Sequence, residues 1–213
     1  MARLGVPRFY PILDAGFLMQ GGISVERFAQ ELREAGIRFL QYRDKDASDE
    51  LLLERAALLR EIFPSSDSCL ILNDRVALVA PTGFDGVHVG QEDVSPLAAR
   101  ALLGPDAIIG VSTHGERQLL SAKDGPVDYV AIGPVFSTSS KLVPDPVVGL
   151  EGVRAARAIT DKPVVAIGGI GRSNCAAVME AGADSVAVIS DVVPRAGAST
   201  AKIVEEFLLL CTK

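Results

Sequence analysis

Short apolar runs alternate with helix-like segments along the whole chain, and this alternation constrains the fold more than any other feature. Short apolar runs bounded by turn residues are typical of parallel strands that are buried on both faces. Eight such runs are present, at residues 9–14, 39–42, 70–72, 86–90, 108–111, 127–132, 163–167 and 185–189. Helical patterns lie between or after them, at residues 24–36, 48–63, 75–80, 95–104, 116–123, 150–159, 172–181 and 199–210.

Eight strand–helix units without a linker predict a closed (β/α)8 TIM barrel with parallel strands rather than an open doubly wound sheet. We therefore expect a single domain over residues 1–213. A barrel of this length must have short loops. The long irregular stretch at residues 137–149 is then the best candidate for an active-site lid.

The composition limits the partners and the compartment. Hydrophobic residues make up 48% of the chain and the mean hydropathy is +0.30, which suits a large core. A net charge of −6 and a pI near 5.0 argue against a nucleic-acid or anionic membrane partner. No apolar run approaches the roughly 20 residues of a membrane span, and the N-terminus lacks a signal core.

The cysteines indicate the redox environment. Cys69, Cys175 and Cys211 lie far apart and form no CxxC motif, which fits reduced, buried thiols better than disulfides or zinc. We therefore expect a cytoplasmic protein. The sequence does not set the oligomeric state and leaves a homo-oligomer open.

Polar residues follow most of the apolar runs, where a barrel of parallel strands places them at one rim. The set comprises Gln41, Arg43, Lys45, Asn73, Asp74, Asp93, Ser112, His114, Thr138, Ser140, Lys141, Gly168, Gly169 and Ser190. Asp74 and Asp93 follow neighbouring runs and are candidates for holding Mg²⁺, which takes carboxylates, water and substrate phosphate. The alternative for each aspartate is a helix cap or a turn.

A second group of residues fits phosphate. Gly168 and Gly169 follow the seventh run, and Ile189 and Ser190 end the eighth. Barrels commonly hold phosphate between these two loops on backbone N–H groups, although a tight turn alone also requires glycine.

Basic residues near the predicted magnesium site complete a set suited to diphosphate. Arg43, Lys45 and Lys141 could stabilise a diphosphate leaving group together with Mg²⁺, although a solvated loop cation is the alternative for each. His88 lies between two valines and is expected to be a hydrogen-bonded structural residue. His114 lies beyond the rim residues and is expected to have a supporting role.

Several motifs in register resemble the thiamine phosphate synthase family. They are QYRDK (41–45), ND (73–74), GVHVGQED (86–93), GVSTH (110–114), GPVFSTSSK (133–141), GLEGVR (149–154), PVVAIGGI (163–170) and VAVIS (186–190). The resemblance implies a TIM barrel that joins hydroxymethylpyrimidine diphosphate to thiazole phosphate and releases diphosphate, through a pyrimidine-methyl cation.

The same resemblance implies roles for individual residues. Asp74 and Asp93 would bind Mg²⁺, and Ser112 and Lys141 would be catalytic. The pyrimidine diphosphate would contact Gln41, Tyr42, Arg43, Asp44, Lys45, Asn73, Ser112 and Lys141. The thiazole phosphate would contact Thr138, Ser139, Ser140, Gly169, Ile189 and Ser190.

Three positions depart from the family pattern. Tyr42 stands where the family usually has leucine, and Ser140 replaces a frequent threonine but keeps the hydroxyl. Asp191 follows Ser190 where a small neutral residue is usual. A carboxylate there would repel a bound phosphate unless it turns away.

Two other functions fit the same barrel. One is a thiazole tautomerase, which would not need the magnesium and diphosphate apparatus. The other is a non-catalytic sensor of a phosphorylated ligand. The presence of both aspartates together with Lys45 and Lys141 favours the synthase, whereas the thiazole tautomer that is accepted stays open.

Overall fold

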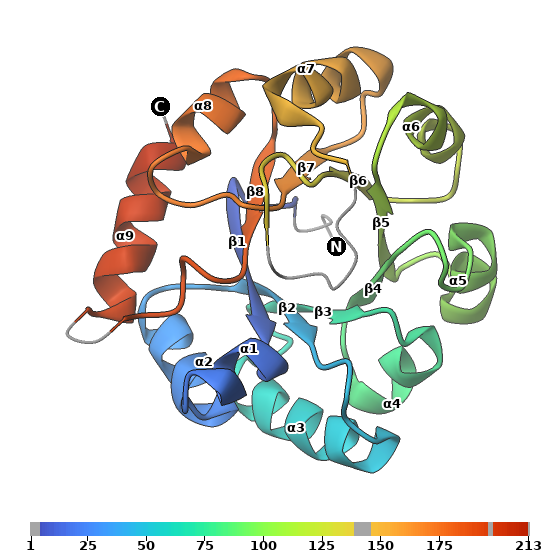
Figure 1. Cartoon of the computed structure of the whole chain (residues 1–213). Coiled ribbons are helices and arrows are strands. Elements are labelled where there is room, and N and C mark those ends of the chain that lie inside the picture. The colour runs from blue at the N-terminus through green and yellow to red at the C-terminus, as the bar shows by residue number, and fades with distance from the viewer. Residues whose placement is uncertain (1–4, 139–145, 196–197, 213) are drawn as a thin grey trace.

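The predicted (β/α)8 barrel is confirmed by a computed structural model that describes residues 5–138, 146–195 and 198–212. Eight parallel strands form a closed ring in sequence order, and helices surround it (Figure 1). Pairing of β1 with β8 closes the ring, with Phe9 opposite Val186 and Pro11 opposite Val188. The strands are β1 (Phe9–Asp14), β2 (Phe39–Arg43), β3 (Cys69–Asn73), β4 (Gly86–Val89), β5 (Ile108–Thr113), β6 (Tyr129–Ile132), β7 (Val164–Ile167) and β8 (Ser185–Val188).

The helices follow the predicted order with three differences. They are α1 (Ala15–Gln20), α2 (Val25–Glu34), α3 (Asp49–Ile62), α4 (Val79–Thr82), α5 (Pro96–Leu103), α6 (Glu116–Lys123), α7 (Gly149–Ile159), α8 (Cys175–Glu180) and α9 (Thr200–Cys211). The short helix α1 was not expected, and a 3-10 turn, Val76–Leu78, precedes α4. Helix α8 begins three residues later than predicted, because the Asn174 side chain accepts a hydrogen bond from the Gly171 N–H and forms a turn there.

Buried side chains form two layers separated by the barrel wall. The larger layer packs between the strands and the helices and includes Leu13, Leu40, Tyr42 and Val186. The smaller layer fills the barrel with the side chains of Tyr10, Ile12, Phe39, Cys69, Ile71, Tyr129, Ala131, Val165 and Ala187. This division follows from strand geometry, because successive side chains point to opposite faces.

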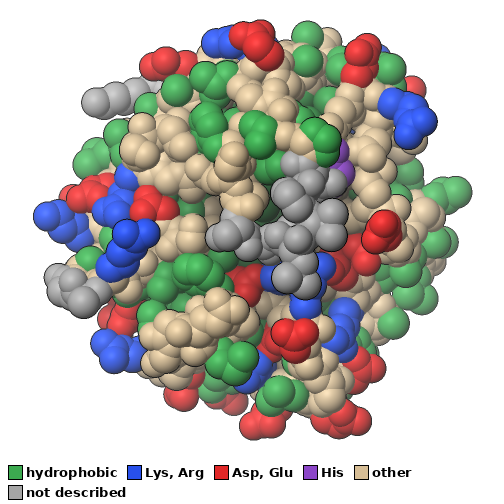
Figure 2. All heavy atoms as spheres, in the orientation of Figure 1, with side chains coloured by type: hydrophobic (Ala, Val, Ile, Leu, Met, Phe, Trp, Pro, Cys, Tyr) green, Lys and Arg blue, Asp and Glu red, His purple; other side chains and the backbone are tan. Residues whose placement is uncertain are grey.

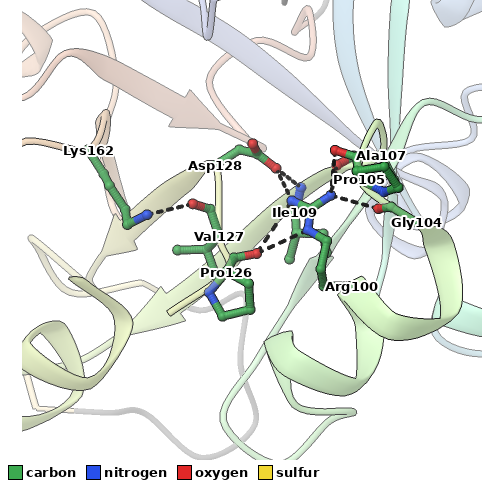
Figure 3. A network of polar contacts seen from close by, with 9 residues as sticks. All are labelled: Arg100, Gly104, Pro105, Ala107, Ile109, Pro126, Val127, Asp128 and Lys162. Atoms are coloured by element: carbon green, nitrogen blue, oxygen red, sulfur yellow. Dashed lines mark hydrogen bonds and ion pairs between the residues drawn. The ribbon is translucent and has the colours of Figure 1, made fainter. Parts of the chain in front are cut away.

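Arginine–aspartate pairs repeat in three places where strands begin. Asp128, just before β6, accepts hydrogen bonds from the Ile109 N–H of β5 at 2.8 Å and from Arg100 of α5 at 2.6 Å (Figure 3). Arg100 also donates to the carbonyl oxygens of Gly104 and Ala107 after α5. Each pair therefore ties a helix end to two neighbouring strands.

The other two pairs repeat this arrangement. Asp85 before β4 accepts from Arg60 of α3 and from the Leu70 N–H of β3, both at 2.7 Å. Asp184 before β8 accepts from Arg157 of α7 at 2.6 Å and from the Val164 N–H of β7 at 2.8 Å. We call these three pairs the amino-end braces.

No helix in the described ranges is both long enough and apolar enough to cross a membrane.

We predict that Asp128→Ala lowers the free energy of unfolding by about 2–3 kcal/mol, because it removes the carboxylate that pairs with a half-buried guanidinium and leaves a strand N–H without its acceptor. Urea unfolding measures this change. Asp161→Ala, at an exposed position, is the matched control and should change stability by less than about 0.5 kcal/mol. Equal stability of the two variants would show that the braces contribute nothing.

Candidate active site at the carboxyl rim

Asp74 and Asp93, the predicted magnesium ligands, lie against each other at the carboxyl rim. Burial raises the pKa of the Asp74 carboxyl to about 6, and the charge of Asp93 and a hydrogen bond with it add to the rise. Lys45 lies 3.8 Å from Asp74 and partly offsets this effect, as does a hydrogen bond from Asn73. Two carboxylates and a cation therefore meet where β2, β3 and β4 end.

Backbone geometry fixes each carboxylate. Asp74 has a φ of 63°, a left-handed conformation that is uncommon for a residue other than glycine, and its N–H donates to the His88 carbonyl at 2.8 Å. Asp93 accepts a hydrogen bond from the Gly90 N–H at 2.7 Å, which closes a turn after β4. Gln91 in that turn donates to the Ser112 carbonyl oxygen at 2.5 Å, so the turn is attached to β5.

This carboxylate pair fits a magnesium ion better than a metal that needs many protein ligands. Among the described residues, no group of three or more histidine, cysteine, aspartate or glutamate side chains could hold a metal. Mg²⁺ usually takes one or two carboxylates and completes its shell with water and substrate phosphates. The donor set here is of that kind.

Arg75 supports the loop that carries Lys45, a role that the sequence did not indicate. Its guanidinium pairs with Asp49 at 2.6 Å and donates to the carbonyl oxygen of Ala47 at 2.6 Å. The Lys45 side chain is itself 55% exposed and reaches over the rim to Asp74.

The other members of the predicted QYRDK cluster divide between the two faces of β2. Gln41 points into the barrel and donates to the Tyr10 hydroxyl at 3.0 Å, and Arg43 pairs with Asp14. Tyr42 is fully buried between the barrel and the helices. Its hydroxyl donates to Asp44, which also pairs with Arg55 of α3. The structure therefore does not bring the side chains of Tyr42 and Asp44 to the carboxylate pair.

Ser112 lies on β5 beside His88 of β4. The Ser112 hydroxyl is 2.8 Å from His88 Nε2, and His88 Nδ1 is 3.0 Å from the Tyr129 hydroxyl. Burial lowers the pKa of His88 to about 4, so its imidazole is neutral near pH 7. The expected hydrogen bonding of His88 is present, but its contact with Ser112 was not foreseen.

His114 connects the loops after β5 and β6. Its Nδ1 lies 2.6 Å from the Gly133 carbonyl oxygen, and its backbone N–H donates to Gln118 at 2.6 Å. These contacts suit the expected supporting role.

The glycines after β7 are required by the backbone. Gly168 and Gly169 have φ values of 97° and 65°, and a Cβ on Gly169 would lie 2.6 Å from the Ser137 carbonyl oxygen. The tight-turn explanation is therefore sufficient for the choice of glycine. Phosphate binding there needs separate support.

Asp191 is paired with Arg172 in the loop after β7. Its carboxylate accepts hydrogen bonds from the Arg172 backbone at 2.8 Å and from the Arg172 side chain at 3.1 Å. Burial opposes ionisation, but these hydrogen bonds hold the pKa of Asp191 below its usual range. Arg172 thus compensates the charge of Asp191, and the loops after β7 and β8 are joined.

The remaining predicted residues lie around this rim or outside the described part. Thr138 is half-buried after β6, and Ile189 and Ser190 directly follow β8. Ser139, Ser140 and Lys141, with most of the predicted lid, lie outside the described residues. Figure 2 shows acidic and basic side chains close together on the face of the barrel seen in Figure 1.

The fold and the rim define a TIM-barrel protein with paired carboxylates, hydroxyls and a cation where the strands end. A family model described as thiamine monophosphate synthase matches residues 9–192. The chain belongs to this family, and it is accordingly a transferase of thiamine biosynthesis that forms thiamine phosphate.

Individual relatives agree with this family. A thiamine-phosphate synthase from Koribacter versatilis is 50% identical over 200 residues, which cover 92% of this chain and 94% of that protein. One from Chloroflexus aurantiacus is 40% identical over 87% of this chain and 85% of its own length. The solved thiamine phosphate pyrophosphorylase from Pyrococcus furiosus superimposes with a TM-score of 0.85 at 31% identity, covering 96% of this chain and 95% of that one.

We predict that Asp74→Asn stabilises the metal-free protein at high pH. The folded-state pKa of Asp74 lies above its ordinary value of 3.8, so the protonated carboxyl stabilises the folded state below pH 4. This stabilisation is lost as the carboxyl ionises while pH rises through about 6. Asparagine removes the charge and tolerates the left-handed backbone. Urea unfolding without divalent cations should show a gain of about 1–2 kcal/mol near pH 8 and little change near pH 4.

The exposed Asp161→Asn variant is the control and should show no such pH dependence. A lower stability of Asp74→Asn than of wild type at pH 8 would contradict the repulsion between the two carboxylates.

Proposed function

We propose that the carboxyl rim condenses hydroxymethylpyrimidine diphosphate with thiazole phosphate, and that Mg²⁺ bound by Asp74 and Asp93 supports release of diphosphate. The observation that carries this proposal is the close approach of these two carboxylates with Lys45 at 3.8 Å from Asp74. Two acidic side chains in contact are unfavourable without a cation, and the family relationship supplies substrates whose diphosphate would complete the shell of the ion.

The residues around Asp74 and Asp93 would have two roles in substrate binding. Lys45, Ser112 and Lys141 would donate to the oxygens of the leaving diphosphate, where negative charge increases as the C–O bond breaks. The bound metal would supply further positive charge there. Gln41, Arg43 and Asn73 would orient the pyrimidine diphosphate from the ends of β2 and β3.

The thiazole phosphate would lie at the opposite side of the rim. We place it against Thr138, Ser139 and Ser140 and against Gly169, Ile189 and Ser190 of the loops after β7 and β8. The pairing of Asp191 with Arg172 supports this placement, because the guanidinium compensates the negative charge that follows Ser190.

We further propose that the protein works in the cytoplasm. Three free, buried cysteines support a reducing compartment. A homo-oligomer remains compatible with this proposal, and gel filtration with light scattering would determine the oligomeric state.

We predict that Asp93→Asn lowers kcat for diphosphate release by about 100-fold at a fixed concentration of Mg²⁺. The asparagine oxygen can still accept from the Gly90 N–H, so the turn is retained. The assay is coupled diphosphate release with both substrates, with and without EDTA. Mg²⁺ should also raise the melting temperature of wild type but not of Asp93→Asn.

Glu92→Gln is the matched control, because Glu92 is the exposed acidic neighbour of Asp93 and should leave turnover unchanged. Normal magnesium-dependent turnover by Asp93→Asn would remove the metal assignment. Turnover of the thiazole substrate alone would instead indicate a tautomerase.

A further inference from the structure

A chain of hydrogen bonds crosses the inside of the barrel from Gln41 to Ser112. Gln41 Nε2 donates to the Tyr10 hydroxyl at 3.0 Å, and the hydroxyls of Tyr10 and Tyr129 are 3.5 Å apart. Tyr129 then lies 3.0 Å from His88 Nδ1, and His88 Nε2 lies 2.8 Å from the Ser112 hydroxyl. The chain thus joins side chains of β2, β1, β6, β4 and β5 in that order.

The members of this chain are enclosed by the apolar interior of the barrel. Tyr10 and Tyr129 are 1% and 0% exposed, and Gln41 and His88 are 2% and 6% exposed. Gly110 provides the space for the Tyr129 ring, because a Cβ at that position would lie 2.1 Å from the ring. Tyr10 and Tyr129 approach edge to face, with ring centroids 6.4 Å apart. Polar groups buried to this extent need a partner for each hydrogen, so the chain has little freedom.

The direction of donation follows from the end at Gln41. The Gln41 amide donates to the Tyr10 oxygen, so the hydroxyl hydrogen of Tyr10 needs an acceptor elsewhere. Among the residues that the structure describes, the Tyr129 oxygen is the acceptor that the geometry offers. The opposite direction would direct the Tyr129 hydrogen at Tyr10 and leave the hydrogen of Tyr10 without a partner.

The same logic continues through His88. The Tyr129 hydroxyl then donates to Nδ1, and a neutral imidazole with an occupied acceptor at Nδ1 carries its hydrogen on Nε2. Both ring nitrogens of His88 face hydroxyl groups at a position that is 6% exposed, which favours a neutral imidazole. His88 Nε2–H therefore donates to the Ser112 oxygen, and the hydroxyl hydrogen of Ser112 remains free for an acceptor at the rim.

We infer that Tyr10, Tyr129 and His88 are positioning residues that fix Ser112 as a hydrogen-bond donor to the leaving diphosphate. This inference rests on the proposed contact between Ser112 and the diphosphate. No proton is transferred: the electron pair of the C–O bond leaves with diphosphate, and the hydrogen stays on Ser112. A hydroxyl that already accepts a hydrogen bond is a better donor, and a donor fixed in advance needs no reorientation as charge develops.

The test is a double-mutant cycle between Tyr129→Phe and Ser112→Ala. We expect Tyr129→Phe to lower kcat by about 5–10-fold and to change KM for the pyrimidine diphosphate by less than about twofold. In the Ser112→Ala background the same substitution should have almost no further effect on kcat. His88→Gln, whose amide can still donate toward Ser112, should retain more activity than His88→Leu.

Thr113→Val is the matched control. Thr113 is a fully buried residue on the same strand as Ser112. Its hydroxyl donates to the Ala131 carbonyl oxygen at 2.8 Å and takes no part in the chain of hydrogen bonds. It should lower the melting temperature without changing kcat. If Tyr129→Phe does not fold, His88→Gln in the same two backgrounds replaces it in the cycle.

The possible results separate this inference from the proposed function. If Tyr129→Phe lowers kcat by the same factor with and without the Ser112 hydroxyl, the inference is overturned, because the effect would then be structural. A normal kcat for Tyr129→Phe alongside an impaired Ser112→Ala would overturn it as well and leave the proposed function intact. A normal kcat for Ser112→Ala would remove the proposed role of Ser112 and the inference together.

Discussion

The pairing of β1 with β8 is the interaction on which the rest of the structure depends. Without it, eight parallel strands would form an open sheet with two unpaired edges. With it, the carboxyl ends of all eight strands lie on one ring, so residues far apart in sequence become neighbours. Asp74 meets Asp93, and His88 meets Ser112, because β3, β4 and β5 are neighbours that run in the same direction.

Closure also creates a narrow interior that side chains must fill. Most of the filling is apolar, but Tyr10, Gln41, His88 and Tyr129 bring polar groups into it. An unpaired polar atom buried there would cost about 1–3 kcal/mol, so the four residues are compatible with folding only as a connected set. Their connection reaches the rim at Ser112, and the packing of the barrel thereby influences the chemistry at its mouth.

The sequence predicted the strands well because the buried runs are short, apolar and separated by turn residues. Helix α1 was missed because six residues are too few to show a period, and its cap is Asp14, the last residue of β1.

The carboxylate pair could be predicted because both aspartates follow neighbouring strands. The QYRDK motif was less informative as one unit, since the alternation along β2 turns Gln41 inward and Tyr42 toward α3. The contact between His88 and Ser112 needs the register of β4 and β5, which the sequence does not contain.

The Asp74–Asp93 pair at the carboxyl rim differs from the aspartates at the amino ends of the strands. At the amino ends, Asp85, Asp128 and Asp184 each meet an arginine and a strand N–H, so their charge is balanced within the chain. At the carboxyl rim, Asp74 has a left-handed backbone conformation and meets Asp93, and a half-exposed lysine and a hydrogen bond from Asn73 offset part of the repulsion. The braces stabilise the amino end of the ring, whereas the Asp74–Asp93 pair at the other end is unfavourable. A cation bound there from solution would relieve the repulsion between the two carboxylates. The separation allows loops at the rim to differ without disturbing the amino-end braces, which lie at the far ends of the strands.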